Sequence, residues 1–485
     1  MQRLSSPRTP STRTLGRKPL KTPLGHTLHS STRLPVYATR KNILRLAMAQ
    51  MRVFGDEHGQ QELLRGEFHG SSSDKGDNSS NKKARAGLCG LLRERKVLEL
   101  ARGKRRLVEV PYTATLAHAA NALLAGRVSA VTVAAPPGHW IGAGGSMIVE
   151  SDPATGAARK HYIGMVNMLD IVIHIAEAGQ DNEDDDLDRR MAVPVSSVIG
   201  HSLEGLTLWT LHPNTSVLDC METFSKGVHR ALVPLESSAP DTIVAVELVE
   251  SAPAYKMVTQ MDVVRFLRDH GAELGAVLSR TVGGLGAASE AVLAVASRTT
   301  VIEAVRTMRA ASLTAVPVVD APVDAYVLQD GRGKKVVETF SATDLRDCPV
   351  ARLRAWLGAG VTEFKEKVAE YRREGGRRPL DSAAAGDGGA QATDDGYDTD
   401  DEDDTAAGRG GGEEEKRMVT CTMESTLGEV VEKAVENHVH RLWVVDEEEG
   451  LLRGVVSLTD VLRVVREAAL GEDQELHSLQ DIVSS

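Results

Sequence analysis

The sequence contains few aromatic residues and few cysteines. Aromatic side chains make up 4% of the 485 residues, whereas hydrophobic residues together make up 41%. The core is therefore expected to consist mainly of Val, Leu, Ala and Met. The cysteines are far apart and form no C-x-x-C pair, so neither a disulfide framework nor a zinc site is expected, and a reducing compartment fits best. They are Cys89, Cys220, Cys348 and Cys421.

Several other features are absent. No apolar run reaches the roughly 18 residues that a membrane span needs, so we expect a soluble protein with no membrane partner. The net charge is -11 at pH 7, and no uniform basic field is present, so nucleic acid is not an expected partner. No Ser/His/Asp or Cys/His constellation and no metal-ligand spacing occurs, so no catalytic residue, no metal and no enzyme activity is expected.

The N-terminal segment has no acidic residues. Residues 1–55 lack Asp and Glu but are rich in Arg, Lys, Ser, Thr and Pro. This composition is typical of a plastid transit peptide, and a disordered basic tail and a true start at Met48 stay open as alternatives. We expect the protein in the cytoplasm, the nucleus or both. A plastid is the alternative, which applies if residues 1–55 are a transit peptide. We expect disorder over residues 1–87 and over an acidic insertion at 376–416.

One short phrase recurs four times in the chain. The phrase reads roughly as two apolar residues, a small polar residue and any two residues, followed by an Asp that opens an apolar helix. The copies are MVNMLDIVIHI (165–175), MVTQMDVVRFL (257–267), TFSATDLRDC (339–348) and VVSLTDVLRVV (455–465). Repeated units of this kind identify an architecture that no single copy would.

Apolar periodicity around the phrases predicts an α+β fold of four β-α-β-β-α repeats. The expected bounds are 88–180, 190–280, 288–375 and 417–471, followed by a C-terminal tail at 472–485. A single charged helix over residues 351–374 is expected to close the third repeat.

This pattern resembles the cystathionine-β-synthase (CBS) domain repeat, and four copies resemble two tandem pairs, each a Bateman module. The layout is similar to that of the gamma subunit of AMP-activated protein kinase. The fourth copy resembles a gamma-subunit repeat along its whole length, VHRLWVVDEEEGLLRGVVSLTDVLRVV. Two other stretches resemble the allied plant CBS-domain-containing proteins, APPGHWIGAGGSMIVESD and PVSSVIGHSLEGLTLWTLHPNTSVLDCMETFSKGVHRALVP. The resemblance covers about residues 90–375 and 417–470.

Each repeated aspartate stands where a strand ends and a helix begins. A carboxylate there caps free backbone N–H groups, but Ser or Asn would serve nearly as well, so four aspartates are more than capping needs. A carboxylate also accepts two hydrogen bonds from a vicinal diol such as ribose O2′ and O3′. The resemblance implies this ribose-binding role, with the best candidate first and the weakest last, for Asp460, Asp262, Asp344 and Asp170.

The resemblance also implies roles for neighbours of these aspartates. The hydroxyl three residues earlier is expected to assist at the ribose or phosphate, and it belongs to Thr259, Ser341 and Ser457, with Asn167 in the first copy. The usual glycine three residues before that is present as Gly164 and Gly454 and is replaced by Lys256 and Glu338. A side chain there is expected to narrow the adenine slot, and a carboxylate is expected to repel phosphate.

Cationic pairs precede the central strand in two copies, His229-Arg230 and His440-Arg441. Arg grips a phosphate bidentately and His donates from one nitrogen, so the resemblance implies phosphate binding. The plain alternative is two solvated basic residues at a strand edge. The other copies carry Arg127-Val128-Ser129 and Leu313-Thr314-Ala315 in this place, so one or two nucleotides are expected rather than four.

The resemblance thus implies a non-catalytic regulatory protein that binds AMP, ADP or ATP as ligand, has no cofactor, and modulates a partner protein kinase or other enzyme. Two alternatives stay open. A CBS-repeat scaffold without nucleotide binding is favoured by Lys256, Glu338 and Asn167. A different adenosyl ligand, such as S-adenosylmethionine, would need no phosphate cations.

Overall fold

The computed structural model describes seven stretches of the chain, which include helices and strands of all four repeats. They are residues 88–135, 160–178, 187–206, 208–235, 254–322, 324–375 and 418–484. The expected disordered segments, 1–87 and 376–416, lie outside the described residues.

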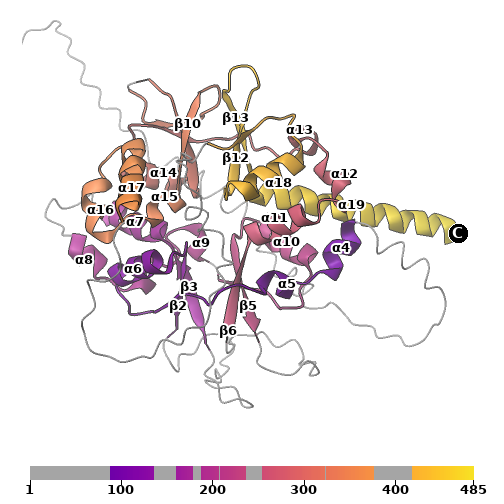
Figure 1. Cartoon of the computed structure of the whole chain (residues 1–485), viewed down its shortest axis with the longest axis horizontal. Helices are drawn as coiled ribbons and strands as arrows, with labels where there is room; N and C mark the ends of the chain where they lie inside the picture. Colours follow the sequence, from indigo (N-terminus) through magenta and orange to yellow (C-terminus); the bar gives the residue numbers. More distant parts are fainter. Residues whose placement is uncertain are drawn as a thin grey trace, which may run out of the picture. The chain divides into compact units, whose positions relative to one another are not determined.

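Each repeat forms the expected β-α-β-β-α unit (Figure 1). Repeat 1 consists of β1 (Glu109–Pro111), α6 (Leu116–Gly126), β2 (Val131–Ala134), β3 (Tyr162–Val166) and α7 (Met168–Ala178). Repeat 2 consists of β4 (Trp209–Thr210), α10 (Val217–Ser225), β5 (Arg230–Leu235), β6 (Ala254–Thr259) and α11 (Gln260–Asp269).

The second half of the chain repeats this plan with small additions. Repeat 3 consists of β7 (Ala294–Ala296), α14 (Val301–Ala310), β8 (Ala315–Val319), the extra strand β9 (Val327–Leu328), β10 (Val336–Ser341) and α15 (Ala342–Arg346). Repeat 4 consists of β11 (Thr420–Cys421), α18 (Leu427–Glu436), β12 (Arg441–Val445), β13 (Leu452–Ser457) and α19 (Leu458–Ser484). The last helix continues through residues 472–484, where the sequence leads us to expect a tail.

The sheet of every repeat has its second strand in the centre. The first strand runs parallel to it on one side, and the strand that carries the recurring phrase runs antiparallel on the other. Arg230 pairs with Thr259 and Arg441 with Ser457, whereas Ala315 pairs with Ser341. The residues equivalent to the His-Arg pairs are therefore Thr314-Ala315 in repeat 3 and, two residues beyond Arg127, Ser129-Ala130 in repeat 1.

The first helix of each repeat begins and ends alike. A Ser or Thr hydroxyl caps each of them by accepting an N–H bond, which is the preferred chemistry at a helix start. The caps are Thr115, Ser216, Thr300 and Thr426. Beyond each helix one residue takes a left-handed conformation with φ between 49° and 91°, namely Arg127, Gly227, Ser312 and His438. This shared turn sets the residue two positions later at the mouth of the central strand.

The segments before the first strands connect each repeat with its tandem partner. Helix α5 (Val97–Ala101) leads into repeat 1 but contacts β5 and β6 of repeat 2. Helix α9 (Leu203–Leu206) leads into repeat 2 but contacts β3 of repeat 1. Ser289 leads into repeat 3 and forms a β-bridge with Val455 of repeat 4. In repeats 1, 2 and 4, the strand that carries the repeated phrase therefore lies beside the segment that leads into the tandem-partner repeat.

The prediction of a single helix over residues 351–374 is wrong, because two helices occupy this region. They are α16 (Val350–Trp356) and α17 (Val361–Gly375), and the sequence Gly358-Ala359-Gly360 separates them. A Cβ at position 360 would lie 3.0 Å from the carbonyl oxygen of Ser297. The interruption lets the backbone pair with the start of α14, where Val301 N–H donates to Ala359 O.

Two large hydrophobic cores join the repeats crosswise. Helix α7 of repeat 1 packs on α14 and α15 of repeat 3, whereas α10 of repeat 2 packs on α19, and α11 packs on α18 and α19 of repeat 4. Smaller clusters join the tandem pairs through their sheets, around Tyr162 and Tyr255 for repeats 1 and 2, and around Trp443 for repeats 3 and 4. Each repeat therefore buries its helices against one repeat and its sheet against another.

All four cysteines are free and buried. Burial raises the pKa of the Cys348 thiol to about 12 and that of the Cys421 thiol to about 11, so both are protonated and unreactive at neutral pH. Within the stretches that the structure describes, no helix combines the length and apolarity of a membrane span.

The close approach at Gly454 gives a testable prediction. A Cβ there would lie 2.7 Å from the carbonyl oxygen of Ser289, and backbone cannot move aside as a side chain can. Gly454→Ala is expected to lower the free energy of unfolding by about 1–3 kcal/mol, as overpacking does. Chemical denaturation measures this change. Gly358→Ala, with nothing within 4 Å of its Cβ, is the matched control, and equal stability of the two variants would contradict the packing.

Candidate functional site

All four repeated aspartates cap their helices through the same oxygen. In each case the backbone N–H three residues earlier donates to Oδ2, at 2.9, 2.7, 2.7 and 3.0 Å for Asp170, Asp262, Asp344 and Asp460. The hydroxyls of Thr259, Ser341 and Ser457 donate to the same Oδ2 atoms. The hydroxyl positions expected to face a nucleotide are thus engaged with the capping aspartates, and the repeats differ at Oδ1.

In repeats 1 and 2 the second carboxylate oxygen is held by the neighbouring repeat's connecting segment. Ser202 N–H donates to Asp170 Oδ1 at 2.6 Å, and the Asp170 side chain is fully buried. Burial raises the pKa of Asp170 to about 7, against the opposing effect of the N–H bonds from Asn167 and Ser202. In repeat 2, Lys104 Nζ lies 2.6 Å from Asp262 Oδ1. Both oxygens of each carboxylate therefore have protein partners.

In repeats 3 and 4 the contacts to Oδ1 are longer. Lys365 Nζ lies 3.8 Å from Asp344 Oδ1, and Arg463 Nη2 lies 3.8 Å from Asp460 Oδ1. The exposed fraction of the side chain is 6% for Asp262, 16% for Asp344 and 23% for Asp460. Asp460, which the sequence ranks first, is thus the most accessible of the four to a ligand.

The two glycines and Lys256 contact connecting segments, whereas Glu338 contacts α17. A Cβ on Gly164 would lie 2.6 Å from Ile199 Cγ2, and a Cβ on Gly454 would meet Ser289 O. Lys256 Nζ donates to the carbonyl oxygen of Lys104. Glu338 Oε1 lies 2.7 Å from Lys365 Nζ, and burial raises the pKa of Glu338 despite this lysine. The glycines at this position therefore leave room for a connecting segment to pass close to the sheet.

The arginines of the two cationic pairs bind hydroxyls in the tandem-partner repeats. Arg230 Nη2 donates to Ser129 Oγ of repeat 1 at 3.0 Å, and Arg441 Nη2 donates to Thr314 Oγ1 of repeat 3 at 2.6 Å. Ser129 and Thr314 occupy the positions that His229 and His440 occupy in the even repeats. The structure therefore brings the mouths of four central strands to one polar cluster.

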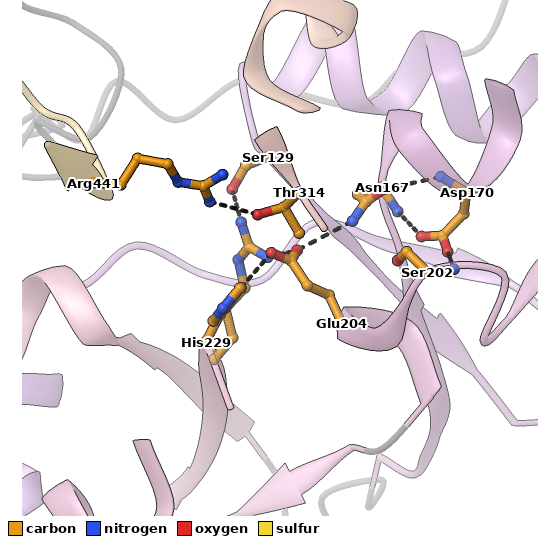
Figure 2. A network of polar contacts seen from close by, with 9 residues as sticks. Ser129, Asn167, Asp170, Ser202, Glu204, His229, Thr314 and Arg441 are labelled. Atoms are coloured by element: carbon orange, nitrogen blue, oxygen red, sulfur yellow. Dashed lines mark hydrogen bonds and ion pairs between the residues drawn. The ribbon is translucent and has the colours of Figure 1, made fainter. Parts of the chain in front are cut away.

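A carboxylate from the segment that leads into repeat 2 also lies in this cluster. Glu204 of α9 places Oε1 2.5 Å from His229 Nδ1 and Oε2 2.5 Å from Arg230 Nη1, and Asn167 Nδ2 donates to Oε2 at 3.1 Å. Figure 2 shows Asn167 between Glu204 on one side and Asp170 on the other. We name this set the central cluster; it consists of Ser129, Asn167, Glu204, His229, Arg230, Thr314 and Arg441.

The pKa values of Glu204 and Arg441 in the central cluster are shifted from their usual ranges. Burial alone would raise the pKa of Glu204, but Arg230 and His229 hold it well below its usual range. Burial lowers the pKa of Arg441 to about 10, and the charge of Glu204 opposes that effect. At neutral pH the cluster therefore contains one carboxylate and two guanidinium groups, which is an environment that attracts an anion.

Sequence patterns identify part of this site. Of the four residues expected to bind phosphate, Arg230, Arg441 and His229 lie in the cluster. The fourth, His440, is exposed just before β12. Glu204 and Lys104 are absent from the sequence-based expectations, because each belongs to a connecting segment that does not recur. The available signal for Ser129 and Thr314 is their place before the central strand.

Other candidate sites in the described residues are weaker. No group of three or more His, Cys, Asp or Glu residues there is arranged to hold a metal ion. A pocket of about 720 Å³ lies at the end of β12 away from Arg441. Its charged lining is mainly acidic, with Glu290, Asp330, Glu424, Asp446 and Glu447 against Arg332 and Arg453. Such a lining is unsuited to a nucleotide phosphate.

Comparison with protein families supports the assignment of the fourth repeat. The family model described as the CBS domain matches residues 415–467, which is the fourth repeat. Among solved structures, the chain is similar to MJ1225 of Methanocaldococcus jannaschii, with a TM-score of 0.46 and 16% identity over 76% of this chain and 99% of that chain.

Two curated relatives from Arabidopsis thaliana match most of the chain. The SNF1-related protein kinase regulatory subunit gamma-like PV42a is 52% identical over 75% of this chain and 92% of its own length. The corresponding PV42b is 47% identical over 79% of this chain and 97% of its own length. At this identity and coverage, the chain belongs to the family of SNF1-related protein kinase regulatory subunit gamma-like proteins.

Proposed function

We propose that this regulatory CBS protein binds an adenine nucleotide at repeat 4 and thereby modulates a partner protein kinase. The proposal is supported by the contacts and the exposure of the Asp460 side chain. Its Oδ2 caps α19, while its Oδ1 faces Arg463 at 3.8 Å, beyond hydrogen-bonding distance. Its side chain is also the most exposed of the four repeated aspartates. A ribose diol can approach this oxygen without displacing a short ion pair.

Phosphate groups would be held on the same repeat by Arg441. This residue pairs in register with Ser457, and Ser457 in turn donates to Asp460. A nucleotide with its ribose at Asp460 therefore has a guanidinium group near the start of the adjacent strand. Because burial weakens the hydration of Arg441, an anionic partner gains more from it than from a solvated arginine.

The kinase partner is inferred from the relatives. PV42a and PV42b carry the name of kinase regulatory subunits of gamma type, so the partner class proposed for this chain is an SNF1-related kinase complex. Nucleotide binding would favour one arrangement of the paired repeats, and the kinase would respond to that arrangement. The shift is limited by the difference in nucleotide affinity between the two arrangements.

A scaffold that binds no nucleotide is the second candidate function. The observation that favours it is the saturation of Asp170 and Asp262, whose Oδ1 atoms have partners at 2.6 Å. A kinase complex that forms equally well with and without nucleotide would support this reading. The two candidates therefore differ in the role of Asp460 and agree on the kinase.

Substitution of single aspartates tests the ribose site. Asp460→Asn retains the size and capping oxygen but loses the charge, and it is expected to weaken AMP and ATP binding roughly tenfold or more. Asp262→Asn is the matched change in repeat 2 and is expected to leave affinity within about twofold, because Lys104 already holds its Oδ1. Isothermal titration calorimetry at millimolar nucleotide measures both. Wild-type affinity in Asp460→Asn, or no binding by the wild type, would contradict the proposal.

Removal of the guanidinium group tests the phosphate contact. Arg441→Met is expected to weaken ATP and AMP binding roughly tenfold while changing adenosine binding little, since adenosine has no phosphate. Arg453→Met removes the same charge from an exposed ion pair with Asp446 and serves as control. If S-adenosylmethionine binds tightly and ignores the Arg441 substitution, the ligand class is wrong.

The link between nucleotide and kinase is tested with purified components. The chain is incubated with an SNF1-related kinase catalytic subunit, with and without AMP and ATP, and complex formation and kinase activity are measured. We expect complex formation in each case and a nucleotide-dependent activity that Asp460→Asn abolishes. A nucleotide-independent activity with intact Asp460 would favour the scaffold instead.

A further inference from the structure

Glu204 holds a place in the central cluster that its own position in the chain does not explain. It lies in a four-residue helix between repeats 1 and 2, outside every repeated element. Nevertheless its carboxylate contacts residues from both repeats of the pair, Asn167 of repeat 1 and His229 and Arg230 of repeat 2. With a side chain only 13% exposed, Glu204 is a structural part of the cluster.

The backbone around Glu204 is held tightly to repeat 1. Ser202 N–H donates to Asp170 Oδ1 at 2.6 Å. A Cβ on Gly205 would lie 2.8 Å from Met165 O and 3.2 Å from Gly200 N, so the chain passes closer to β3 than other residue types allow. The segment that carries Glu204 is thus anchored on both sides of the glutamate. These anchors place its carboxylate among the cations.

The groups around the carboxylate are those that bind phosphate. Each even repeat supplies an arginine, Arg230 and Arg441, and each odd repeat supplies a hydroxyl, Ser129 and Thr314. A carboxylate presents two oxygens to such donors, whereas a phosphate presents three and carries more charge. Glu204 contacts Arg230 directly, while Arg441 binds Thr314 and feels the carboxylate only through its charge. A phosphate group has the oxygens to engage both arginines.

We infer that Glu204 is an internal ligand of the central cluster, which competes with a nucleotide phosphate for the anion position and is displaced by it. The inference rests on the proposed nucleotide-binding function and concerns how that binding is regulated. Displacement would lower the apparent affinity for phosphate and would free the segment 202–206 from its contacts with Asn167 and the His229-Arg230 pair. Occupancy would thereby be transmitted from repeat 4 to the segment that packs on repeat 1.

The ionisation of Glu204 supports this competition. Because Arg230 and His229 hold the pKa of Glu204 well below its usual range, the carboxylate stays charged throughout the physiological pH range.

The test uses the full chain and inorganic pyrophosphate, a probe with no ribose or base. Glu204→Gln keeps the length of the side chain and removes its charge, so pyrophosphate affinity by calorimetry is expected to rise roughly tenfold or more. Glu109→Gln is the matched control, because Glu109 is an ion-paired glutamate outside the cluster, 2.8 Å from Lys160. Its pyrophosphate affinity is expected to equal that of the wild type.

A second measurement on the wild type does not depend on a variant. Hydrogen exchange of backbone amides in residues 202–206 is expected to speed up when ATP is added, since loss of the Glu204 contacts loosens this segment.

Circular dichroism checks that Glu204→Gln is folded. Pyrophosphate is expected to raise the Tm of Glu204→Gln more than it raises the Tm of the wild type.

The outcomes separate this inference from the proposed function. If the wild type binds ATP through Asp460 but Glu204→Gln changes neither pyrophosphate affinity nor segment exchange, the internal ligand is refuted and the function stands. If no nucleotide binds through Asp460 but Glu204→Gln gains pyrophosphate affinity, the cluster is confirmed as a displaceable anion site and the function fails. A fall in pyrophosphate affinity in Glu204→Gln also overturns the inference, because Glu204 would then assist the anion.

Discussion

The structure depends on the burial of helices between repeats that are not neighbours in the chain. A single β-α-β-β-α unit has too little apolar surface to bury both helices and the sheet. Helix α7 buries its apolar face against α14 and α15, and α11 buries its apolar face against α18 and α19. Because these cores place the repeats, they also bring the starts of the central strands together, and the central cluster forms where they meet.

Within this frame one carboxylate serves two purposes. Oδ2 of each repeated aspartate caps the second helix, a local role that any copy can fulfil. In repeats 1 and 2 the partner of Oδ1 comes from a connecting segment, whereas in repeats 3 and 4 the nearest cation is Lys365 of α17 or Arg463 of α19. Ser202 and Lys104 engage it in repeats 1 and 2, and Asp460 retains the most accessible one. Four similar sequences thus produce unequal sites, because the groups around Oδ1 differ from repeat to repeat.

The same division explains what can be predicted from sequence. The repeat elements, the aspartates and Arg230 with Arg441 follow from local spacing that recurs, so their places are predictable. Glu204 and Lys104 occur once, and their contacts are made across tens of residues or more, so no pattern indicates them. The break between α16 and α17 is missed because apolar spacing continues across it, while the tight contact between residue 360 and Ser297 that requires it is tertiary.

The crosswise cores have a consequence for how this chain can vary. Repeats 1 and 2 share sheet contacts, yet their helices are covered by repeats 3 and 4. A half-chain of one tandem pair would expose two apolar helix faces at once, and exposed patches of this kind promote association. Loss of a whole Bateman module during evolution is therefore expected to destabilise this protein. Insertions such as that between α17 and β11 enter where neither core is interrupted.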